Sequence, residues 1–220
     1  MIQLKTEKRW KEICPGLSLA CIEADVQVKN GQEELWVEIE AALSELGNNL
    51  NIEDISKIPA IASSRKAYKT CGKDPARYRL SSEALLRRVV SGKGLYRINN
   101  VVDQLNLVSV TTGFSIGGYD AGKIQGDVSF GVAGDEPYTG IGRGALNIEG
   151  LPVFRDNLGA FGTPTSDSER TSVNENTQRF LMIIINFGND PGLAEAQQKA
   201  VGLLEKYCVA KNIEQTVITC

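Results

Sequence analysis

Three short polar side chains recur at helical spacing near the middle of the chain. Asn99, Asp103 and Asn106 stand at positions i, i+4 and i+7 of a run whose apolar residues also have a helical period, so the three side chains share one arc of the predicted helix. Amides and carboxylates of this length disfavour helix interiors because they compete for backbone hydrogen bonds. Their alignment predicts a role in holding a ligand or orienting water, to which the adjacent Asn100 adds a donor.

A second concentration of hydrogen-bonding side chains lies between Phe161 and Thr171. Thr163, Thr165, Ser166 and Asp167 surround Pro164 within this run. Such a density fits the wall of a polar pocket, and it fits equally well a turn whose residues bond their own backbone. Both interpretations are open from the sequence.

Several kinds of chemistry are excluded by composition. The chain contains no histidine, which rules out a Ser-His or Cys-His nucleophilic pair and any metal site that requires imidazole. The cysteines are odd in number and widely spaced, which favours free thiols over a disulfide framework or a zinc site; they are Cys14, Cys21, Cys71, Cys208 and Cys220. The run Gly140 to Gly144, GIGRG, lacks the Lys-Ser/Thr pair of a phosphate-binding loop.

The run from Ile98 to Asp120, INNVVDQLNLVSVTTGFSIGGYD, resembles the signature of the editing domain of the bacterial phenylalanyl-tRNA synthetase beta subunit. In that signature an Asn-x-x-Asp-x-x-Asn helix leads through a glycine into a strand that ends in Asp. A weaker similarity extends over residues 145–185. Such domains hydrolyse wrongly attached amino acids from tRNA. One departure is that the synthetase pattern carries a histidine where this chain has Gly117.

The resemblance implies a stand-alone deacylase that binds aminoacylated tRNA and hydrolyses mischarged species in trans, with no cofactor and no metal. An aminoacyl ester is already reactive, so a site that orients one water and holds the carbonyl is sufficient. The candidate catalytic residues are Asn106, Asn100 and Asp167. The candidate substrate-binding residues are Asn99, Asp103, Gly117, Gly118, Thr163, Thr165 and Ser166.

The residues and the resemblance allow more than one assignment of the acidic residue and of the function. Either Asp167 or Glu169 could replace the glutamate by which the family recognises the misplaced amino acid. One alternative function is a module of the same fold that binds RNA or an amino acid without catalysis, and another is an accessory to phenylalanine charging. We further expect the polar arc of the helix and the loop Thr163 to Asp167 to face one pocket, because buried amides and carboxylates need partners.

Positive charge is concentrated ahead of the predicted helix. Ten basic residues and two acidic ones lie between Arg65 and Arg97, a local charge of +8 in a chain of net charge −3, so the remainder sums to −11. Such a field attracts a phosphate backbone, although solvated helices are the simpler alternative. The residues predicted to contact tRNA phosphates are Arg77, Arg79, Arg87, Arg88, Lys93 and Arg97.

The elements that must position these groups predict an α+β fold. Short strands separated by glycine over residues 114–187 indicate a β-sandwich of mixed strands. Apolar residues at helical spacing over 33–112 and 191–208 indicate flanking helices. Together they predict three layers, as the resemblance to the synthetase editing domain implies. The unalternating run Phe180 to Ile185 is typical of a central strand covered on both faces. We expect a single domain over residues 1–220. No apolar run suits membrane insertion or export, which favours the cytoplasm.

Overall fold

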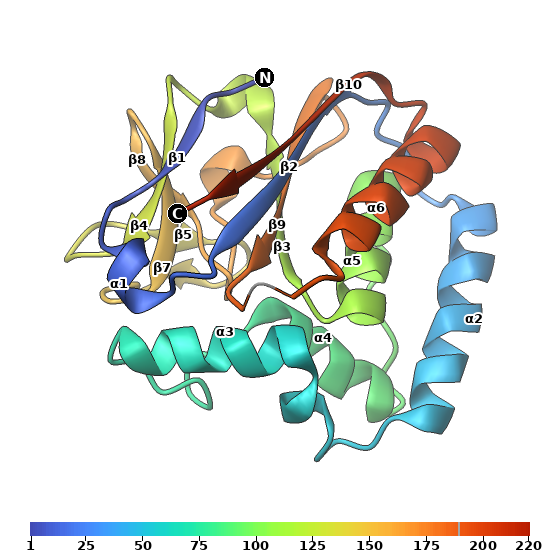
Figure 1. Cartoon of the computed structure of the whole chain (residues 1–220). Coiled ribbons are helices and arrows are strands. Elements are labelled where there is room, and N and C mark those ends of the chain that lie inside the picture. The colour runs from blue at the N-terminus through green and yellow to red at the C-terminus, as the bar shows by residue number, and fades with distance from the viewer. Residues whose placement is uncertain (189) are drawn as a thin grey trace.

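The centre of the molecule is a four-stranded antiparallel sheet with the order β10-β2-β9-β3. Its strands are β2 (Ser18–Asp25), β3 (Ser115–Asp120), β9 (Arg179–Asn186) and β10 (Lys211–Thr219). In the computed structural model, which describes residues 1–188 and 190–220, β9 lies between β2 and β3 and is buried on both faces (Figure 1). Leu181, Ile183 and Ile185 enter one core and Phe180, Met182 and Ile184 the other, which confirms the prediction of a doubly covered strand.

A second sheet packs against one face of this central sheet. It has the order β1-β4-β7-β8, with β1 (Leu4–Thr6) parallel to β4 (Val128–Val132) and with β7 (Pro152–Asp156) and β8 (Gly159–Gly162) antiparallel. Large aromatic side chains fill the space between the sheets, and Trp10 stacks on Phe130 with ring centroids 5.0 Å apart. A small hairpin, β5 (Thr139–Gly140) and β6 (Gly144–Ala145), lies beside the loop after β8.

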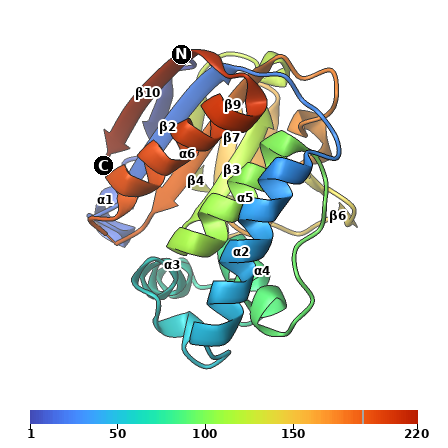
Figure 2. The same cartoon turned by 90° about the vertical axis from the view of Figure 1, so that its right-hand side faces the viewer.

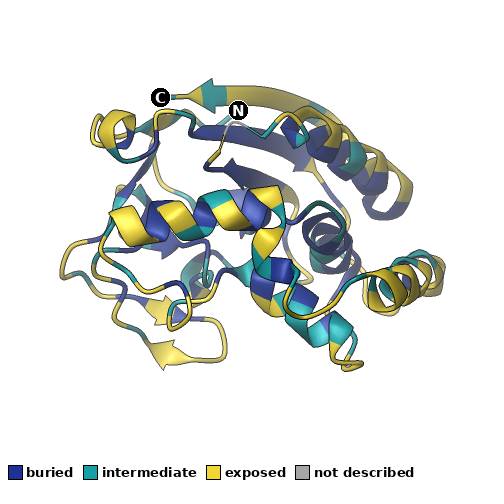
Figure 3. Cartoon of the chain, turned by 60° about the horizontal axis from the view of Figure 1, so that its bottom comes forward, coloured by how far each residue is buried: buried dark blue, intermediate teal, exposed yellow. Residues whose placement is uncertain are grey.

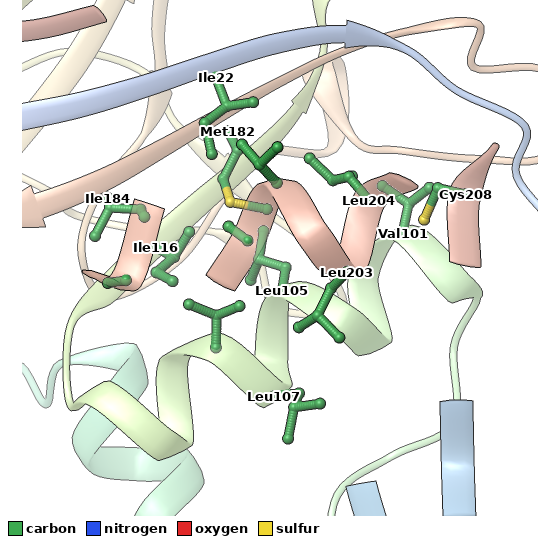
Figure 4. Packing of buried hydrophobic residues seen from close by; sticks show 14 of the residues in the cluster. Ile22, Val101, Leu105, Leu107, Ile116, Met182, Ile184, Leu203, Leu204 and Cys208 are labelled. Carbon is green, nitrogen blue, oxygen red and sulfur yellow. The ribbon is translucent and has the colours of Figure 1, made fainter. Parts of the chain in front are cut away.

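Helices cover the other face of the central sheet. α2 (Glu33–Asn49), α5 (Asn100–Thr112) and α6 (Leu193–Cys208) form this third layer (Figure 2). Side chains of α5 and α6 such as Leu105 and Leu204 meet Ile116 and Met182 of the sheet (Figure 4). Gly118 permits this close approach, because a β-carbon there would lie 2.5 Å from Cδ1 of Leu105.

The remaining helices lie at one end of the layers. α1 (Trp10–Ile13), α3 (Pro59–Thr70) and α4 (Ser81–Val90) form this end, where α3 exposes one edge to solvent (Figure 3). Three short 3-10 helices, η1 (Ile55–Lys57), η2 (Ala121–Lys123) and η3 (Glu169–Thr171), complete the chain. Within the described residues, no helix combines the length and apolar character needed to cross a membrane.

The predicted α+β sandwich with flanking helices is confirmed, and one detail is wrong. Five of the eight sandwich strands lie within residues 114–187, as expected, and β1, β2 and β10 join them from the two ends of the chain. The central helix begins later than the pattern suggested. Its N-cap is Asn99, whose side chain accepts the Val102 N–H, and the preceding Ile98 is 50% exposed.

Candidate functional site

The polar residues at the start of α5 bond to the helix layer. The Nδ2 group of Asn100 donates to the carbonyls of Gln27 and Tyr207 at 2.9 and 2.8 Å, and its Oδ1 accepts the Lys29 N–H at 2.7 Å. Asp103 accepts the indole N–H of Trp36 at 2.8 Å. The polar side-chain atoms of Asn100 and Asp103 are thus hydrogen-bonded to other parts of the chain. The Asn106 side chain is partly exposed and makes no hydrogen bond to any described residue.

The Thr163 to Asp167 loop lies elsewhere, between α3, α4 and the β5–β6 hairpin. The Pro164 carbonyl accepts the N–H of Ser81, the first residue of α4. The Thr165 hydroxyl lies 2.9 Å from the hydroxyl of Tyr68 on α3, and Tyr138 donates to the Ser166 carbonyl at 2.5 Å. The prediction that this loop and the α5 arc share a pocket is therefore not supported by their contacts: the partners of Asn100 and Asp103 come from α2, α6 and residues 27–29.

Both interpretations of the loop are realised in the structure. Thr163 bonds its own turn, since its Oγ1 accepts the Ser166 N–H at 3.0 Å and donates to the Ser166 carbonyl at 2.9 Å. The same loop also lines a cavity of about 310 Å³. The cavity wall consists of Arg77, Tyr78, Arg143, Leu146, Asn147, Ile148, Leu151, Thr163, Thr165 and Ser166.

The cavity has a mixed chemical character. Leu146, Ile148 and Leu151 give it an apolar side, and the loop hydroxyls give it a polar side. Arg77 and Arg143 are exposed and belong to no ion pair among residues 1–188 and 190–220. A ligand with an apolar portion, hydrogen-bonding groups and a negative charge would match these three features.

Asp167 extends from this loop toward β3. Its Oδ1 oxygen is buried and, among the described residues, it has no hydrogen-bond partner within normal geometry, as is also the case for the Tyr119 hydroxyl. Burial raises the pKa of Asp167 to about 7, against the opposing effects of Tyr119 and the Gly118 N–H. Burial and the nearby Asp167 charge both raise the pKa of Tyr119. Asp167 therefore lies behind the loop, against the centre of the sandwich, and Glu169 is exposed.

Gly117 and Gly118 leave no open space for a ligand, which corrects the expectation from sequence. A β-carbon on Gly117 would overlap the Tyr119 hydroxyl and ring, and one on Gly118 would meet Leu105 and Phe180. The chain's own side chains therefore occupy the room that these two glycines provide.

The six predicted phosphate contacts divide into two groups. Arg87 shares the buried Glu83 with Arg65, Arg88 lies over the Tyr96 ring at 3.8 Å, and Arg97 pairs with Glu33 and Glu40. Arg77, Arg79 and Lys93 are exposed without an ion pair in the described chain. No three His, Cys, Asp or Glu side chains of the described residues are grouped to hold a metal ion.

Sequence reasoning missed several residues of the site. Arg143 was visible in the Gly140 to Gly144 run, but that run matches no phosphate loop, so its turn carried no signal. Tyr68, Tyr119 and Tyr138 are isolated aromatics in the sequence, and only the fold brings their hydroxyls to the loop.

Comparison with known proteins agrees with the resemblance of the central helix and strand. The model of the B3/4 domain family matches residues 63–208. Among solved structures, the chain is similar to an N-terminal fragment of the phenylalanyl-tRNA synthetase beta subunit from Pyrococcus horikoshii, at 15% identity and a TM-score of 0.49. That match covers 98% of this chain and 50% of the fragment, so the chain spans about half the fragment's length. No curated protein matches the sequence. The chain belongs to the B3/4 domain family.

Proposed function

We propose that this chain binds aminoacylated tRNA and hydrolyses a wrongly attached amino acid in trans. The observation that carries the proposal is the cavity of about 310 Å³ in which a hydroxyl-bearing loop, an apolar wall and two unpaired arginines meet. The 3′ end of a charged tRNA presents the same three features: an amino-acid side chain, an ester with hydroxyl neighbours, and a phosphate.

The proposed arrangement gives each wall of the cavity a task. Arg77 and Arg143 attract the terminal phosphate, and Leu146, Ile148 and Leu151 contact the amino-acid side chain. The hydroxyls of Thr165 and Ser166 hold the carbonyl and one water. The water oxygen then adds to the ester carbon, the ribose oxygen leaves with a proton, and the free amino acid and intact tRNA are released.

The residues assigned to the reaction differ from those expected on α5. Asn100 and Asp103 have structural partners, so they are assigned to the scaffold here. Asp167 holds a supporting position behind the loop, since its buried Oδ1 is directed at β3 and not at the cavity wall. Thr163 is assigned to shaping the turn.

A binding module without catalysis is the second candidate. It is favoured by one observation, namely that the Thr163 and Thr165 hydroxyls already bond protein groups and so are partly committed before a substrate arrives. Such a module would retain the cavity and the arginines and would lack turnover. An accessory role in phenylalanine charging has no separate support in the geometry.

The direct test is to incubate the purified chain with a panel of mischarged tRNAs and to follow release of the amino acid. We expect multiple-turnover release from at least one species, and a fall of ten-fold or more for Thr165→Val, which keeps the side-chain shape and removes the hydroxyl. Lys211→Gln, an exposed change at the edge strand β10, is the matched control. Saturable tRNA binding without release from any species would support the non-catalytic module, and the absence of both would refute the assignment to tRNA.

A further inference from the structure

Eight exposed or partly exposed cations gather where α1 approaches α3, and we call this region the α1–α3 surface. Its members are Lys8, Arg9, Lys11, Lys66, Lys69, Lys73, Arg77 and Arg79. Within the described residues none of them belongs to an ion pair, although thirteen such pairs occur elsewhere in the chain. The acids on the same segments are Glu12 and Asp74, so these two segments carry eight positive and two negative charges.

The two segments are adjacent although more than fifty residues separate them in sequence. α1 lies beside the C-terminal end of α3 (Figure 1). A cavity of about 320 Å³ is lined from one side by Ile13 to Gly16 and from the other by Ser63, Lys66 and Ala67. Burial raises the pKa of the Cys71 thiol at the end of α3, and the charge of Arg9 opposes that rise, which also places Arg9 near Cys71.

The α1–α3 surface continues to the candidate site. Arg77 belongs both to the surface and to the wall of the 310 Å³ cavity, where Tyr78 follows it. Lys73 and Arg77 both lie over the Tyr78 ring, at 5.1 and 5.5 Å from its centroid. The positive charge therefore extends from α1 past the end of α3 to the place where the proposed substrate ester is held.

The other predicted phosphate contacts do not offer a comparable surface. Glu83 pairs with Arg87, the α2 acids Glu33 and Glu40 pair with Arg97, and Arg88 packs over the Tyr96 ring. Among the described residues this leaves Lys93 as a single exposed cation without an ion pair. A phosphate group at Arg87 or Arg97 would compete with an existing carboxylate, whereas on the α1–α3 surface it would replace only water and counterions.

We propose that the α1–α3 surface binds the phosphodiester backbone of the base-paired RNA stem whose 3′ end enters the cavity beside Arg77. This inference rests on the proposed function, since it takes the charged tRNA as the ligand. Regular spacing of negative charge along a duplex suits a row of unpaired cations, and contacts of this kind fix position without reading sequence. Lys8, Arg9 and Lys11 lie outside the segment that matches the family model, so the N-terminal segment of this chain enlarges the surface beyond the matched part.

The test compares two triple variants with a control of equal charge change. One variant is Lys8→Gln, Arg9→Gln, Lys11→Gln, and the other is Lys66→Gln, Lys69→Gln, Lys73→Gln. The control is Lys29→Gln, Lys57→Gln, Lys211→Gln, three exposed cations that belong neither to this surface nor to the predicted phosphate contacts. The probe is an uncharged tRNA transcript with a fluorescent label, titrated at several salt concentrations, and melting temperatures confirm folding of each variant.

Each surface variant should reduce the slope of log affinity against log salt by about 2 to 3 and weaken binding about ten-fold or more at low salt, because about one counterion is released per phosphate contact. The control should retain a slope within about 1 of the original chain. Unchanged slopes in both surface variants, an equal loss in the control, or no RNA binding by the original chain would each overturn the inference.

The same variants separate this inference from the proposed function. Suppose that the original chain releases amino acid and that the surface variants do so with unchanged KM. The deacylase assignment then stands, and the proposal that the α1–α3 surface binds RNA is wrong. If the surface variants lose RNA affinity while no mischarged tRNA is ever hydrolysed, the surface stands and the deacylase assignment fails.

Discussion

The hydroxyl of Tyr119 occupies the space that a side chain on Gly117 would need. A β-carbon on Gly117 would overlap the hydroxyl and ring of Tyr119, and a β-carbon on Gly162 of the opposite sheet would do the same. Tyr119 is fully buried, and its ring packs edge-on against Phe161 at 4.9 Å. A histidine at position 117, as in the synthetase pattern, cannot be placed here unless Tyr119 moves. The missing histidine and the buried tyrosine are thus parts of one arrangement.

Replacing Gly117 by alanine should therefore destabilise the fold by about 1 to 3 kcal/mol, as expected for overpacking a full core. Tyr119→Phe removes the atom nearest to the new β-carbon, so the double variant should recover at least about 0.5 kcal/mol relative to additivity. Urea unfolding of the four proteins in the cycle measures this coupling.

Gly202→Ala provides the control for the first prediction. Gly202 lies in α6 with no atom within 4 Å of an added β-carbon, so alanine should stabilise the helix by about 0.5 to 1 kcal/mol. If Gly117→Ala is as stable as Gly202→Ala, the sandwich interior accommodates the added methyl group and the prediction is wrong.

Asp167 should make stability depend on pH in a defined direction. Its folded pKa of about 7 lies above the ordinary value near 3.9 because the carboxyl is buried. The folded state therefore binds the proton more tightly, so this contribution is complete below about pH 4, declines as pH rises toward 7 and is lost above 7. Asp167→Asn, which cannot ionise, should gain stability relative to the original chain between pH 4.5 and 8, by on the order of 1 to 4 kcal/mol.

Urea unfolding of both proteins across that pH range checks the Asp167 prediction, and taking the difference removes contributions from other titrating groups. The unfolding free energies of the two proteins should be closest at low pH, and the difference between them should grow as pH rises. A constant difference would mean that Asp167 ionises at its ordinary pKa in the folded chain.

The main features of the fold were predictable because local sequence patterns specify them. The unalternating strand Phe180 to Ile185 and the helix ending at Gly113 follow from apolar spacing and from a glycine with φ of 79°. Pairings between distant segments were not predictable, since nothing in residues 4–6 or 211–219 specifies which sheet edge each will join. The sequence signalled the Thr163 to Ser166 loop through its composition, but it did not signal the partners of that loop, because Tyr68, Tyr138 and Arg143 acquire their roles only from tertiary placement.

The polar arc on α5 shows why a polar stripe in a sequence is ambiguous. Polar residues at helical spacing have the same appearance whether they line a pocket or tie a helix to its neighbours. Asn99 caps the helix, and Asp103 holds Trp36 and the Ile98 N–H. Only the positions of α2 and α6 distinguish the two cases.

Arg87 should behave as a structural residue. Its Nε donates to the buried Glu83 at 3.0 Å, and Arg65 donates to the other oxygen at 2.8 Å. Arg87→Gln leaves Glu83 with one cation, so we expect a loss of about 1 to 3 kcal/mol in unfolding free energy and an unchanged salt dependence of tRNA binding. Lys93→Gln, an exposed change on the following loop, should alter stability by less than about 0.5 kcal/mol. Equal stability of the two variants, with a flattened salt slope for Arg87→Gln, would restore Arg87 as a phosphate contact.

Asn100 and Asn106, two asparagines on one helix, should respond oppositely to truncation. Asn100 is buried and makes three hydrogen bonds to Gln27, Lys29 and Tyr207, so Asn100→Ala leaves three backbone groups without a partner and should cost about 2 to 4 kcal/mol. The Asn106 side chain is partly exposed and makes no hydrogen bond to a described residue. Asn106→Ala should therefore change stability by less than about 0.5 kcal/mol.

Turnover distinguishes a scaffold from a site at these two positions. Release of amino acid, measured per folded molecule after urea titration of each variant, should be unchanged within about two-fold for Asn106→Ala, because the proposed cavity lies at the Thr163 to Ser166 loop and not at α5. Thr165→Val in the same assay should lower release by ten-fold or more. If Asn106→Ala instead abolishes release at full stability, the reaction takes place on α5, as the sequence pattern alone suggested, and the loop cavity is not the site.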